Sequence, residues 1–424
     1  MASTGLNSSV RAADASAARA DIAIALASYN HARTIGPVVR AVRDGLATHF
    51  GSSAAQIVLA DGGSTDGTRE AARAATGATE LVEVGYSAPI ASLTTVPYHG
   101  FPGRANALRA ILETIRRLSV RAVALVDAGI ETADSTRIAN LVAPILTDQF
   151  DYASSYYVRH RFDGLITKGI VAPLFRTLYG ATLRQPAAGE FGCSARMADH
   201  FLQQDVWDRE GAQAGIDLWL ASEAVCGGFR VCEAALGVRG MVHHETTDLS
   251  TTLAQVVGSV FADMEHRVGV WQRVRQAVTV PLFGADERPE PEAAVPNVER
   301  LTESFRLGYR ELREIWTWVL PPKTIIALRR LAEAPSDRFR FDDLLWASIV
   351  YDFALGYSLR LMPRDHLLRS LTPIYSGWMA SIVPQIQDAT EAQVDARLEQ
   401  VCAAFDAEKR YLISRWRWPE RLRR

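Results

Sequence analysis

Short apolar runs alternate with amphipathic stretches over the first third of the chain. The runs cover residues 21–28, 56–60, 81–84 and 122–126, and each has the length and composition of a buried strand. Between the last two runs, residues 104–118 carry apolar side chains at three- and four-residue intervals, which is typical of an amphipathic helix. Strands that alternate with helices at this spacing predict an α/β fold with a doubly wound, mostly parallel, Rossmann-like sheet. Ligands of such sheets bind at the carboxyl ends of the strands.

The rest of the chain divides by composition. Its first residues are mostly small or polar, which favours a disordered arm. A long helix is expected from about residue 253 to 277, and the stretch 284–296 is rich in proline and acidic residues, as in a linker or exposed loop. Amphipathic stretches after it predict a C-terminal helical segment. We therefore expect an arm over residues 1–20, an α/β domain over 21–245, a long helix and linker over 246–290, and a helical domain over 291–424.

Composition excludes several classes of protein. The chain has 424 residues, 48% of them hydrophobic and 22% charged, which suits a globular protein with more than one domain. A net charge of −2 argues against nucleic-acid binding through a basic face. No apolar run approaches the roughly 20 residues that cross a bilayer, and the first residues lack the apolar core of a signal peptide. The four cysteines form no Cys-x-x-Cys pair. We expect a cytoplasmic protein in a reducing compartment.

The most informative polar segment is residues 61–68, Asp-Gly-Gly-Ser-Thr-Asp-Gly-Thr, directly after a predicted strand. Its glycines allow a tight backbone turn against a ligand, and the carboxylate of Asp61 can accept a hydrogen bond from a planar base. The pattern also fits a plain strand-to-helix turn whose polar residues cap the next helix. Polar residues after two other predicted strands, Ser28-Tyr-Asn30 and Asp127, favour a binding site, because the carboxyl ends of parallel strands lie at one edge of the sheet.

Four segments together resemble the nucleotide-sugar-dependent glycosyltransferases of the GT-A fold. They are Ala-Ser-Tyr-Asn (27–30), the segment 61–68, Gly-Arg-Ala-Asn-Ala-Leu (103–108) and Val-Asp-Ala-Gly (126–129), and their order and spacing match that family over roughly residues 21–245. The resemblance implies a catalytic domain over this range, with donor-binding roles for Ser28, Asn30, Asp61, Gly63, Arg104, Asp127 and Gly189.

Within that set, the resemblance implies that Ser28, Asn30 and Asp61 hold the nucleoside. Arg104 would stand in place of a lysine that is usual near the pyrophosphate, with the same charge but a different geometry.

A divalent-cation site is implied at Asp127. The family usually has Asp-x-Asp here, and two carboxylates suit a hard cation such as Mg²⁺ or Mn²⁺ that bridges phosphate oxygens. This chain reads Asp127-Ala-Gly129, so the second carboxylate is missing and the dependence on a cation is open. In relatives of mannosylglycerate synthase and glucosyl-3-phosphoglycerate synthase a histidine completes the site, which points to His244 or His243. Asp127 could instead only cap the following turn.

The segment Gln-Pro-Ala-Ala-Gly-Glu-Phe (185–191) is similar to a segment of the same synthases that lies beside the sugar. The similarity implies that the backbone of Gly189 approaches the sugar and that Glu190 accepts hydrogen bonds from its hydroxyls, although a solvated loop carboxylate is the alternative. Asp217, at a predicted helix start, matches the general base of inverting relatives and a hydroxyl-binding residue of the retaining synthases. A helix N-terminus stabilises a carboxylate without any further role.

An acceptor site is predicted from Arg159 and Thr167. An arginine fork binds a carboxylate through two hydrogen bonds, and a threonine hydroxyl can donate another. In mannosylglycerate synthase an arginine and a threonine at comparable separation bind the glycerate carboxylate, and these two residues match them best. Alternating arginines on a strand are also common on a solvated face.

Taken together, the resemblance implies a retaining glycosyltransferase with catalytic residues Asp217 and Glu190. It would move a hexose from UDP-glucose or GDP-mannose to a small carboxylate acceptor, glycerate or 3-phosphoglycerate, in the manner of compatible-solute synthesis. Two alternatives stay open. One is an inverting transferase that acts on a polysaccharide or lipid acceptor, and the other is a nucleotide-sugar-binding protein that has lost catalysis. The apolar helical C-terminal segment also makes us expect a homo-oligomer.

Overall fold

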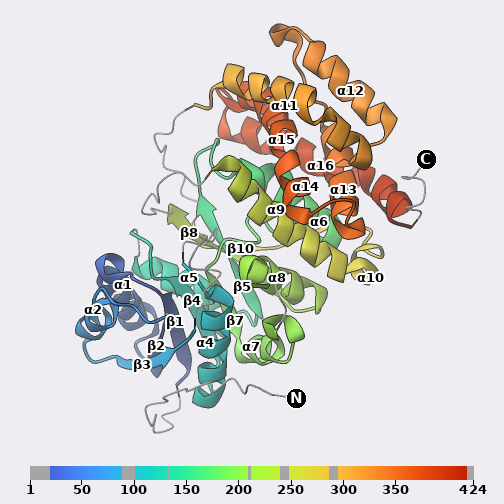
Figure 1. Ribbon diagram of the computed structural model, residues 1–424. Coiled ribbons are helices and arrows are strands. Elements are labelled where there is room, and N and C mark those ends of the chain that lie inside the picture. The colour runs from blue at the N-terminus through green and yellow to red at the C-terminus, as the bar shows by residue number, and fades with distance from the viewer. Residues whose placement is uncertain are drawn as a thin grey trace, which may run out of the picture. The chain divides into compact units, whose positions relative to one another are not determined.

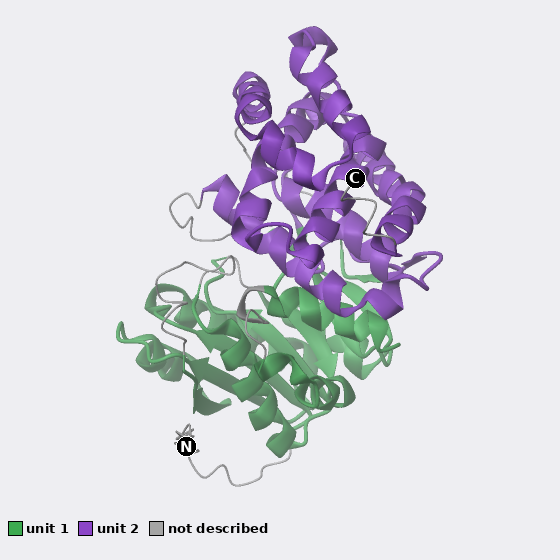
Figure 2. Ribbon diagram, turned by 45° about the vertical axis from the view of Figure 1, so that its right-hand side comes forward, with its two compact units in different colours: residues 1–157, 188–244, 281–287 green, residues 158–187, 245–280, 288–424 purple. Residues whose placement is uncertain are grey.

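The computed structural model describes residues 20–87, 101–131, 134–208, 212–238, 248–285 and 295–417, with no side chains for 212–214. The chain forms two compact units (Figure 2). Unit 1 contains residues 1–157, 188–244 and 281–287, and unit 2 contains residues 158–187, 245–280 and 288–424. Residues 158–187, which were expected within the α/β domain over 21–245, pack within unit 2.

Unit 1 holds a sheet of eight strands (Figure 1). In the order of the sheet they are β10 (Leu282–Phe283), β8 (Val231–Val238), β5 (Tyr152–Val158), β7 (Phe191–Ser194), β4 (Ala122–Asp127), β1 (Ile22–Ser28), β2 (Ala55–Asp61) and β3 (Glu80–Gly85). Strands β3, β2, β1 and β4 run parallel to one another, while β7 runs antiparallel to both of its neighbours. The predicted α/β class and mostly parallel sheet are confirmed.

Helices cover both faces of this sheet because its central strands are apolar on both sides. Every residue of β1 is buried. Ile22, Ile24 and Leu26 belong to one core cluster with apolar residues of α1 (Ala32–Phe50), α2 (Thr68–Ala75) and α5 (Ser135–Leu146). The helices α4 (Arg104–Leu118), α7 (Ala195–Leu202) and α8 (Ala212–Cys226) pack with one another, and α4 also packs on β1, β2 and β3. A short 3₁₀ helix, Asp205–Asp208, joins α7 to α8.

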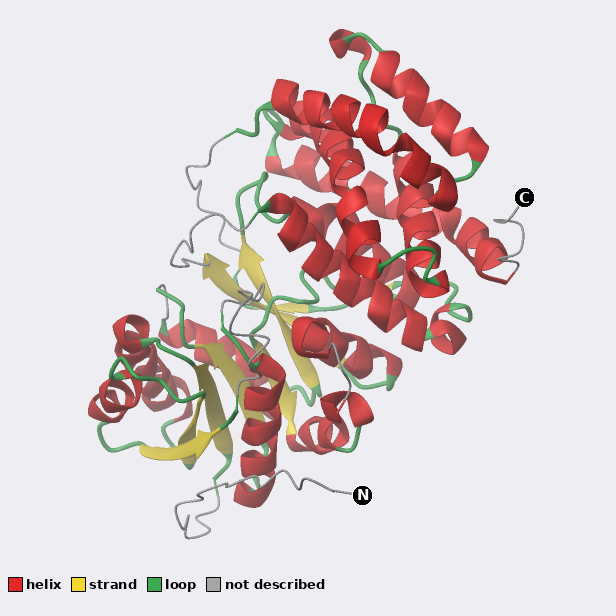
Figure 3. Ribbon diagram, viewed as in Figure 1, coloured by secondary structure: helices red, strands yellow, loops and turns green. Residues whose placement is uncertain are grey.

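Unit 2 is almost entirely helical, as the colours of Figure 3 show. The predicted C-terminal helical segment is confirmed. A π-helical turn, Thr167–Val171, leads into α6 (Ala172–Tyr179). The other helices are α9 (Leu249–His266), α10 (Val268–Trp271), α11 (Val298–Val319), α12 (Pro322–Glu333), the 3₁₀ helix Ser336–Arg338, α13 (Asp343–Leu359), α14 (Arg364–Ser370), α15 (Thr372–Ile386) and α16 (Glu391–Arg417). The two-residue strands β6 (Ala181–Thr182) and β9 (Val278–Thr279) pair with each other.

Tryptophans form the centre of unit 2. Trp346 and Trp378 are fully buried and stacked, with ring centroids 5.5 Å apart. Gly169 lies against them, because a β-carbon there would come 2.2 Å from the Trp378 ring. Its carbonyl accepts a hydrogen bond of 2.9 Å from Trp346 Nε1, which ties the π-helical turn to α13. Within the described part of the chain, no helix combines the length and apolar character that a membrane span requires.

Candidate functional site

The carboxyl ends of β1, β2 and β4 lie in register. Ser28 pairs with Asp61 across β1 and β2, and Ala27 pairs with Asp127 across β1 and β4. Three polar strand ends that were predicted from separate sequence segments therefore share one edge of the sheet (Figure 1).

The carboxylate of Asp61 organises the loop that follows it. Ser28 Oγ donates to Asp61 Oδ2 at 2.9 Å, and the backbone N–H groups of Gly63 and Ser64 donate to Oδ1 at 3.0 and 2.9 Å. The hydroxyl of Ser64 adds a bond of 2.6 Å to Oδ2. Gly63 has φ +90°, a left-handed conformation that favours glycine. The loop is therefore folded around a buried carboxylate.

Asn30 joins the loop after β1 to the loop after β2. Its side-chain oxygen accepts a 3.0 Å hydrogen bond from Thr65 N–H, and its own N–H donates to Ser64 Oγ at 2.8 Å. Its φ of +57° is tolerated better by asparagine than by most residues. Ser28, Asn30, Asp61 and Gly63, four of the predicted donor-binding residues, are thus brought together by these contacts.

Asp66 stabilises the starts of two helices. Its Oδ1 accepts a hydrogen bond of 3.1 Å from Thr68 N–H at the start of α2, and its Oδ2 accepts one of 2.9 Å from Ala32 N–H at the start of α1. Burial opposes ionisation here, but these bonds and one from the Thr68 hydroxyl outweigh it and lower the pKa of Asp66. In this segment Asp66 therefore caps the helices, while Asp61 stabilises the turn.

Arg104 and Asp217 form a buried ion pair together with Gly189. The Arg104 side chain is 4% exposed and that of Asp217 is 3% exposed. Arg104 Nε lies 2.9 and 2.8 Å from the two oxygens of Asp217, and Arg104 Nη2 donates to the carbonyl of Gly189. The left-handed backbone of Gly103, at φ +76°, precedes the first residue of α4. Three residues predicted from three segments thus converge.

Glu190 lies at the centre of a second buried network. Its Oε1 accepts a hydrogen bond of 2.9 Å from Asp127 N–H. Its Oε2 accepts bonds from Arg137 Nη1, at 2.5 Å, and from the Tyr157 hydroxyl. Arg137 also donates to the carbonyl of Leu236 at 3.1 Å, so the network ties α5 to β8. Both oxygens of the Glu190 carboxylate thus accept hydrogen bonds from groups of the protein itself. The expected role was to accept hydrogen bonds from sugar hydroxyls. Arg137 and Tyr157 were not predicted as site residues, because no residue near them in the sequence indicates that they contact Glu190.

Asp127 is followed by a tight turn. Its Oδ1 accepts a hydrogen bond of 2.9 Å from Gly129 N–H, and the next carbonyl, that of Ala128, accepts one of 2.7 Å from the Thr34 hydroxyl. Asp127 therefore caps the turn that follows it, which is one part of the alternative to a metal-binding role. Asp134, also close in sequence, caps α5 by accepting from Arg137 N–H at 2.9 Å.

A cation site cannot be completed from the residues that the structure describes. The predicted ligands His243 and His244 lie outside them. Among the described residues there is no group of three or more histidine, cysteine, aspartate or glutamate side chains that could hold a metal ion. Asp127 is thus the one predicted ligand whose position is given, and a single carboxylate does not make a Mg²⁺ or Mn²⁺ site.

The predicted acceptor residues belong to unit 2. Thr167 begins the π-helical turn. Arg159 packs near Gly164, where a β-carbon would lie 3.3 Å from Arg159 Nη1. Arg161, two residues further along the chain, binds backbone groups. Its Nη1 donates to three carbonyls at the end of α15, those of Ile386, Gln387 and Ala389. The alternating arginines are therefore not equivalent.

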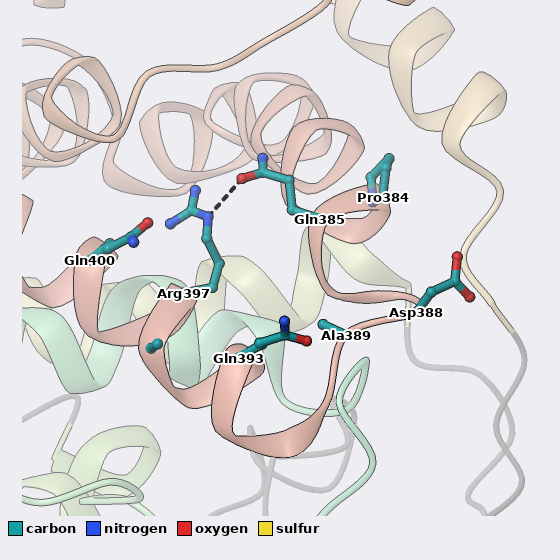
Figure 4. Close-up of a pocket in the computed structure, with 8 residues that line it drawn as sticks. Pro384, Gln385, Asp388, Ala389, Gln393, Arg397 and Gln400 are labelled. Atoms are coloured by element: carbon teal, nitrogen blue, oxygen red, sulfur yellow. Dashed lines mark hydrogen bonds between the residues drawn. The ribbon is translucent and has the colours of Figure 1, made fainter.

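A shallow groove of about 530 Å³ lies in unit 2, between α15 and α16. Arg397 donates to Gln385 Oε1 at 2.8 Å (Figure 4). Through both terminal nitrogens it also donates to the carboxylate of Asp343. The lining residues are Pro384, Gln385, Asp388, Ala389, Gln393, Ala396, Arg397 and Gln400. None of the predicted site residues lines this groove, so we assign it no part in the predicted chemistry.

No protein-family model and no curated protein matched the chain. Among solved structures it is similar to glucosyl-3-phosphoglycerate synthase from Mycobacterium tuberculosis in complex with Mg²⁺ and uridine diphosphate, at 22% identity and a TM-score of 0.42, over 59% of this chain and 80% of that one. It is also similar to the same synthase with Mn²⁺, UDP-glucose and phosphoglyceric acid, at 21% identity and a TM-score of 0.39, over 64% of this chain and 90% of that one.

Proposed function

We propose that the chain is a retaining glycosyltransferase that moves a hexose from a nucleoside diphosphate sugar to glycerate or 3-phosphoglycerate. The observation that carries this proposal is the meeting of the predicted donor-binding residues at one sheet edge, with Ser28 paired to Asp61 and Ala27 paired to Asp127. Convergence of polar residues at the carboxyl ends of parallel strands is the usual arrangement of a ligand site in such a sheet.

The donor would bind along this edge. The loop built by Asp61 and Asn30 would hold the nucleoside, and the charge of Arg104 would favour the diphosphate. Stabilising the negative charge that develops on a leaving group is commonly the largest single contribution to catalysis. In a retaining reaction the leaving phosphate oxygen can take the proton of the acceptor, so no protein base is needed on the opposite face of the sugar. Both oxygens of Asp217 accept hydrogen bonds from Arg104, which supports a positioning role better than proton abstraction.

The proposal includes a divalent cation, and the dependence of the transfer reaction on that cation is to be measured. Asp127 would be one ligand and His244 or His243 another. The acceptor carboxylate would bind Arg159 and Thr167, and UDP-glucose and GDP-mannose are the donors to compare. We assign no step of the reaction to the cation.

The test is a screen of both donors against both acceptors, with Mg²⁺, Mn²⁺ or a chelator, on wild type and Asp127→Ala. Transfer with retained anomeric configuration in at least one combination is the expected result. An inverted product would identify the inverting alternative. A metal role for Asp127 would be wrong if Asp127→Ala worked at the full wild-type rate.

A second candidate is a nucleotide-sugar-binding protein without transferase activity. Gly129 supports it, since this residue removes the second carboxylate of the motif. It predicts that wild type binds a nucleoside diphosphate but turns over none of the donor and acceptor pairs.

A further inference from the structure

His31 lies at the candidate donor site, although no motif assigned it a role. It follows Asn30 directly and precedes the first residue of α1. Its ring Nδ1 accepts a hydrogen bond of 3.1 Å from Tyr29 N–H. Its own N–H donates to the Thr68 hydroxyl oxygen at 2.8 Å, so the backbone that carries the ring is fixed between the first two loops.

The bond from Tyr29 determines what the other ring nitrogen can do. A neutral imidazole has one nitrogen that accepts and one that carries a hydrogen. Because Nδ1 of His31 accepts, the hydrogen is on Nε2. A nitrogen that carries a hydrogen cannot ligate a metal ion, but it can donate a hydrogen bond to an anionic oxygen.

The ring faces the space beside the shortened metal motif. A β-carbon added to Gly129 would lie 3.1 Å from His31 Nε2 and 3.4 Å from Asp127 Oδ1. The imidazole therefore lies in tight contact with the place where a side chain at position 129 would begin. Glycine at this position leaves room for it, and an aspartate would require the ring to move.

An aromatic contact relates this ring to the arginine of the site. The rings of His31 and Phe101 meet edge to face, with centroids 6.1 Å apart at 83°. The guanidinium carbon of Arg104 lies 5.5 Å from the centroid of the same Phe101 ring. His31 and Arg104, two groups that can donate to anionic oxygen, thus both contact the ring of Phe101.

We propose that His31 is a further donor-binding and catalytic residue, whose Nε2–H donates to an oxygen of the nucleoside diphosphate. It takes the place of the missing second carboxylate as a group beside Asp127 that favours the diphosphate. The inference rests on the function proposed above, and it adds a donor for the charge that develops on the leaving diphosphate. Its step is hydrogen bonding alone, so no bond to protein forms or breaks.

The test compares diphosphate with nucleoside binding by calorimetry in the presence of EDTA. Wild type, His31→Ala and His31→Gln are titrated with UDP, GDP, uridine and guanosine. His31→Ala is expected to weaken binding of the diphosphate roughly 10- to 100-fold, the range for one hydrogen bond to a charged group. Nucleoside binding should stay unchanged, and His31→Gln, which keeps an N–H donor, should recover part of the loss. His49→Ala, at the exposed end of the same helix, is the control.

The outcomes separate this inference from the proposed function. If wild type binds neither diphosphate in EDTA, this inference is wrong, and if it binds neither of them with Mn²⁺ as well, the proposed function fails too. If wild type binds and His31→Ala binds equally well, the inference alone is wrong. An equal loss for nucleoside and diphosphate would show that His31 only supports the loop, and would also overturn it.

A swapped variant tests the replacement directly. His31→Ala combined with Gly129→Asp removes the imidazole and restores the second carboxylate. Its diphosphate affinity should be weak in EDTA and should rise at least 10-fold with Mn²⁺, by a larger factor than in wild type. A response to Mn²⁺ no larger than that of wild type would contradict the replacement.

Discussion

Arg104 and Asp217 are joined by a buried hydrogen-bonded ion pair, although they lie 113 residues apart in the chain. The pair fixes the start of α4 against α8, and the carbonyl of Gly189 takes a further bond from the same guanidinium. A buried charge is costly unless it is paired and hydrogen-bonded. Each member of this pair is therefore needed to keep the other in place.

Asp217→Ala should destabilise the protein by about 3–5 kcal/mol, because it leaves the Arg104 charge buried without its partner. The free energy of unfolding from urea denaturation measures this effect. Asp208→Ala is the matched control, since it breaks an ion pair to Arg109 in which the Asp208 side chain is 78% exposed. That change should cost at most about 1 kcal/mol. Equal effects of the two substitutions would contradict a stabilising buried pair.

Glu190→Gln should also be strongly destabilising. The substitution removes the negative charge that faces Arg137, whose side chain is 1% exposed, and we expect a loss of about 3–5 kcal/mol. Tyr157→Phe removes only one hydrogen bond to the same carboxylate and should cost about 1.5–3 kcal/mol. Urea denaturation of both variants checks the order of the effects. A stable Glu190→Gln protein would mean that the network contributes little.

Gly63→Ala should cost about 1–2 kcal/mol through the backbone alone. The residue has φ +90°, and no heavy atom lies within 4 Å of an added β-carbon, so strain in the left-handed region is the only penalty. Gly85→Ala is the control, because an added β-carbon there also meets nothing and no left-handed φ is involved. Thermal unfolding of the two variants should show a lower midpoint only for Gly63→Ala. A similar midpoint for both would rule out the strained turn.

The stability of unit 2 should depend on the pH through Asp352. Burial raises the pKa of this carboxyl to about 6, although Arg415 and the Tyr411 hydroxyl favour its ionised form. In the unfolded chain the carboxyl titrates near 3.8. Between these values the folded protein holds a proton that the unfolded chain has lost, so the stabilising contribution is complete below about pH 4 and is lost as the pH rises through 6.

Asp352→Asn isolates this contribution. Wild type should lose up to about 3 kcal/mol relative to the variant between pH 4 and pH 7.5. Free energies of unfolding of both proteins at several pH values give the difference, in which the titration of other groups cancels. A difference that does not change with pH would show that Asp352 titrates alike in both states.

The parallel strands, the helices between them and the polar residues at the strand ends could be predicted from the sequence, because apolar periodicity and turn residues are local properties. The loop that Asp61 folds around itself is local in the same way, since its partners Gly63 and Ser64 are two and three residues away. The helical C-terminal segment followed from amphipathic periodicity alone.

Tertiary structure decided the rest, since it sets contacts between residues that are distant in the chain. In the folded chain β7 lies antiparallel between β4 and β5, and Glu190 accepts a hydrogen bond from Asp127 N–H. Tertiary structure also brought His31 beside Gly129, where the sequence records only an absent carboxylate. Such pairings depend on strand register and on which side chains fill the space between elements, and no spacing along the chain encodes them.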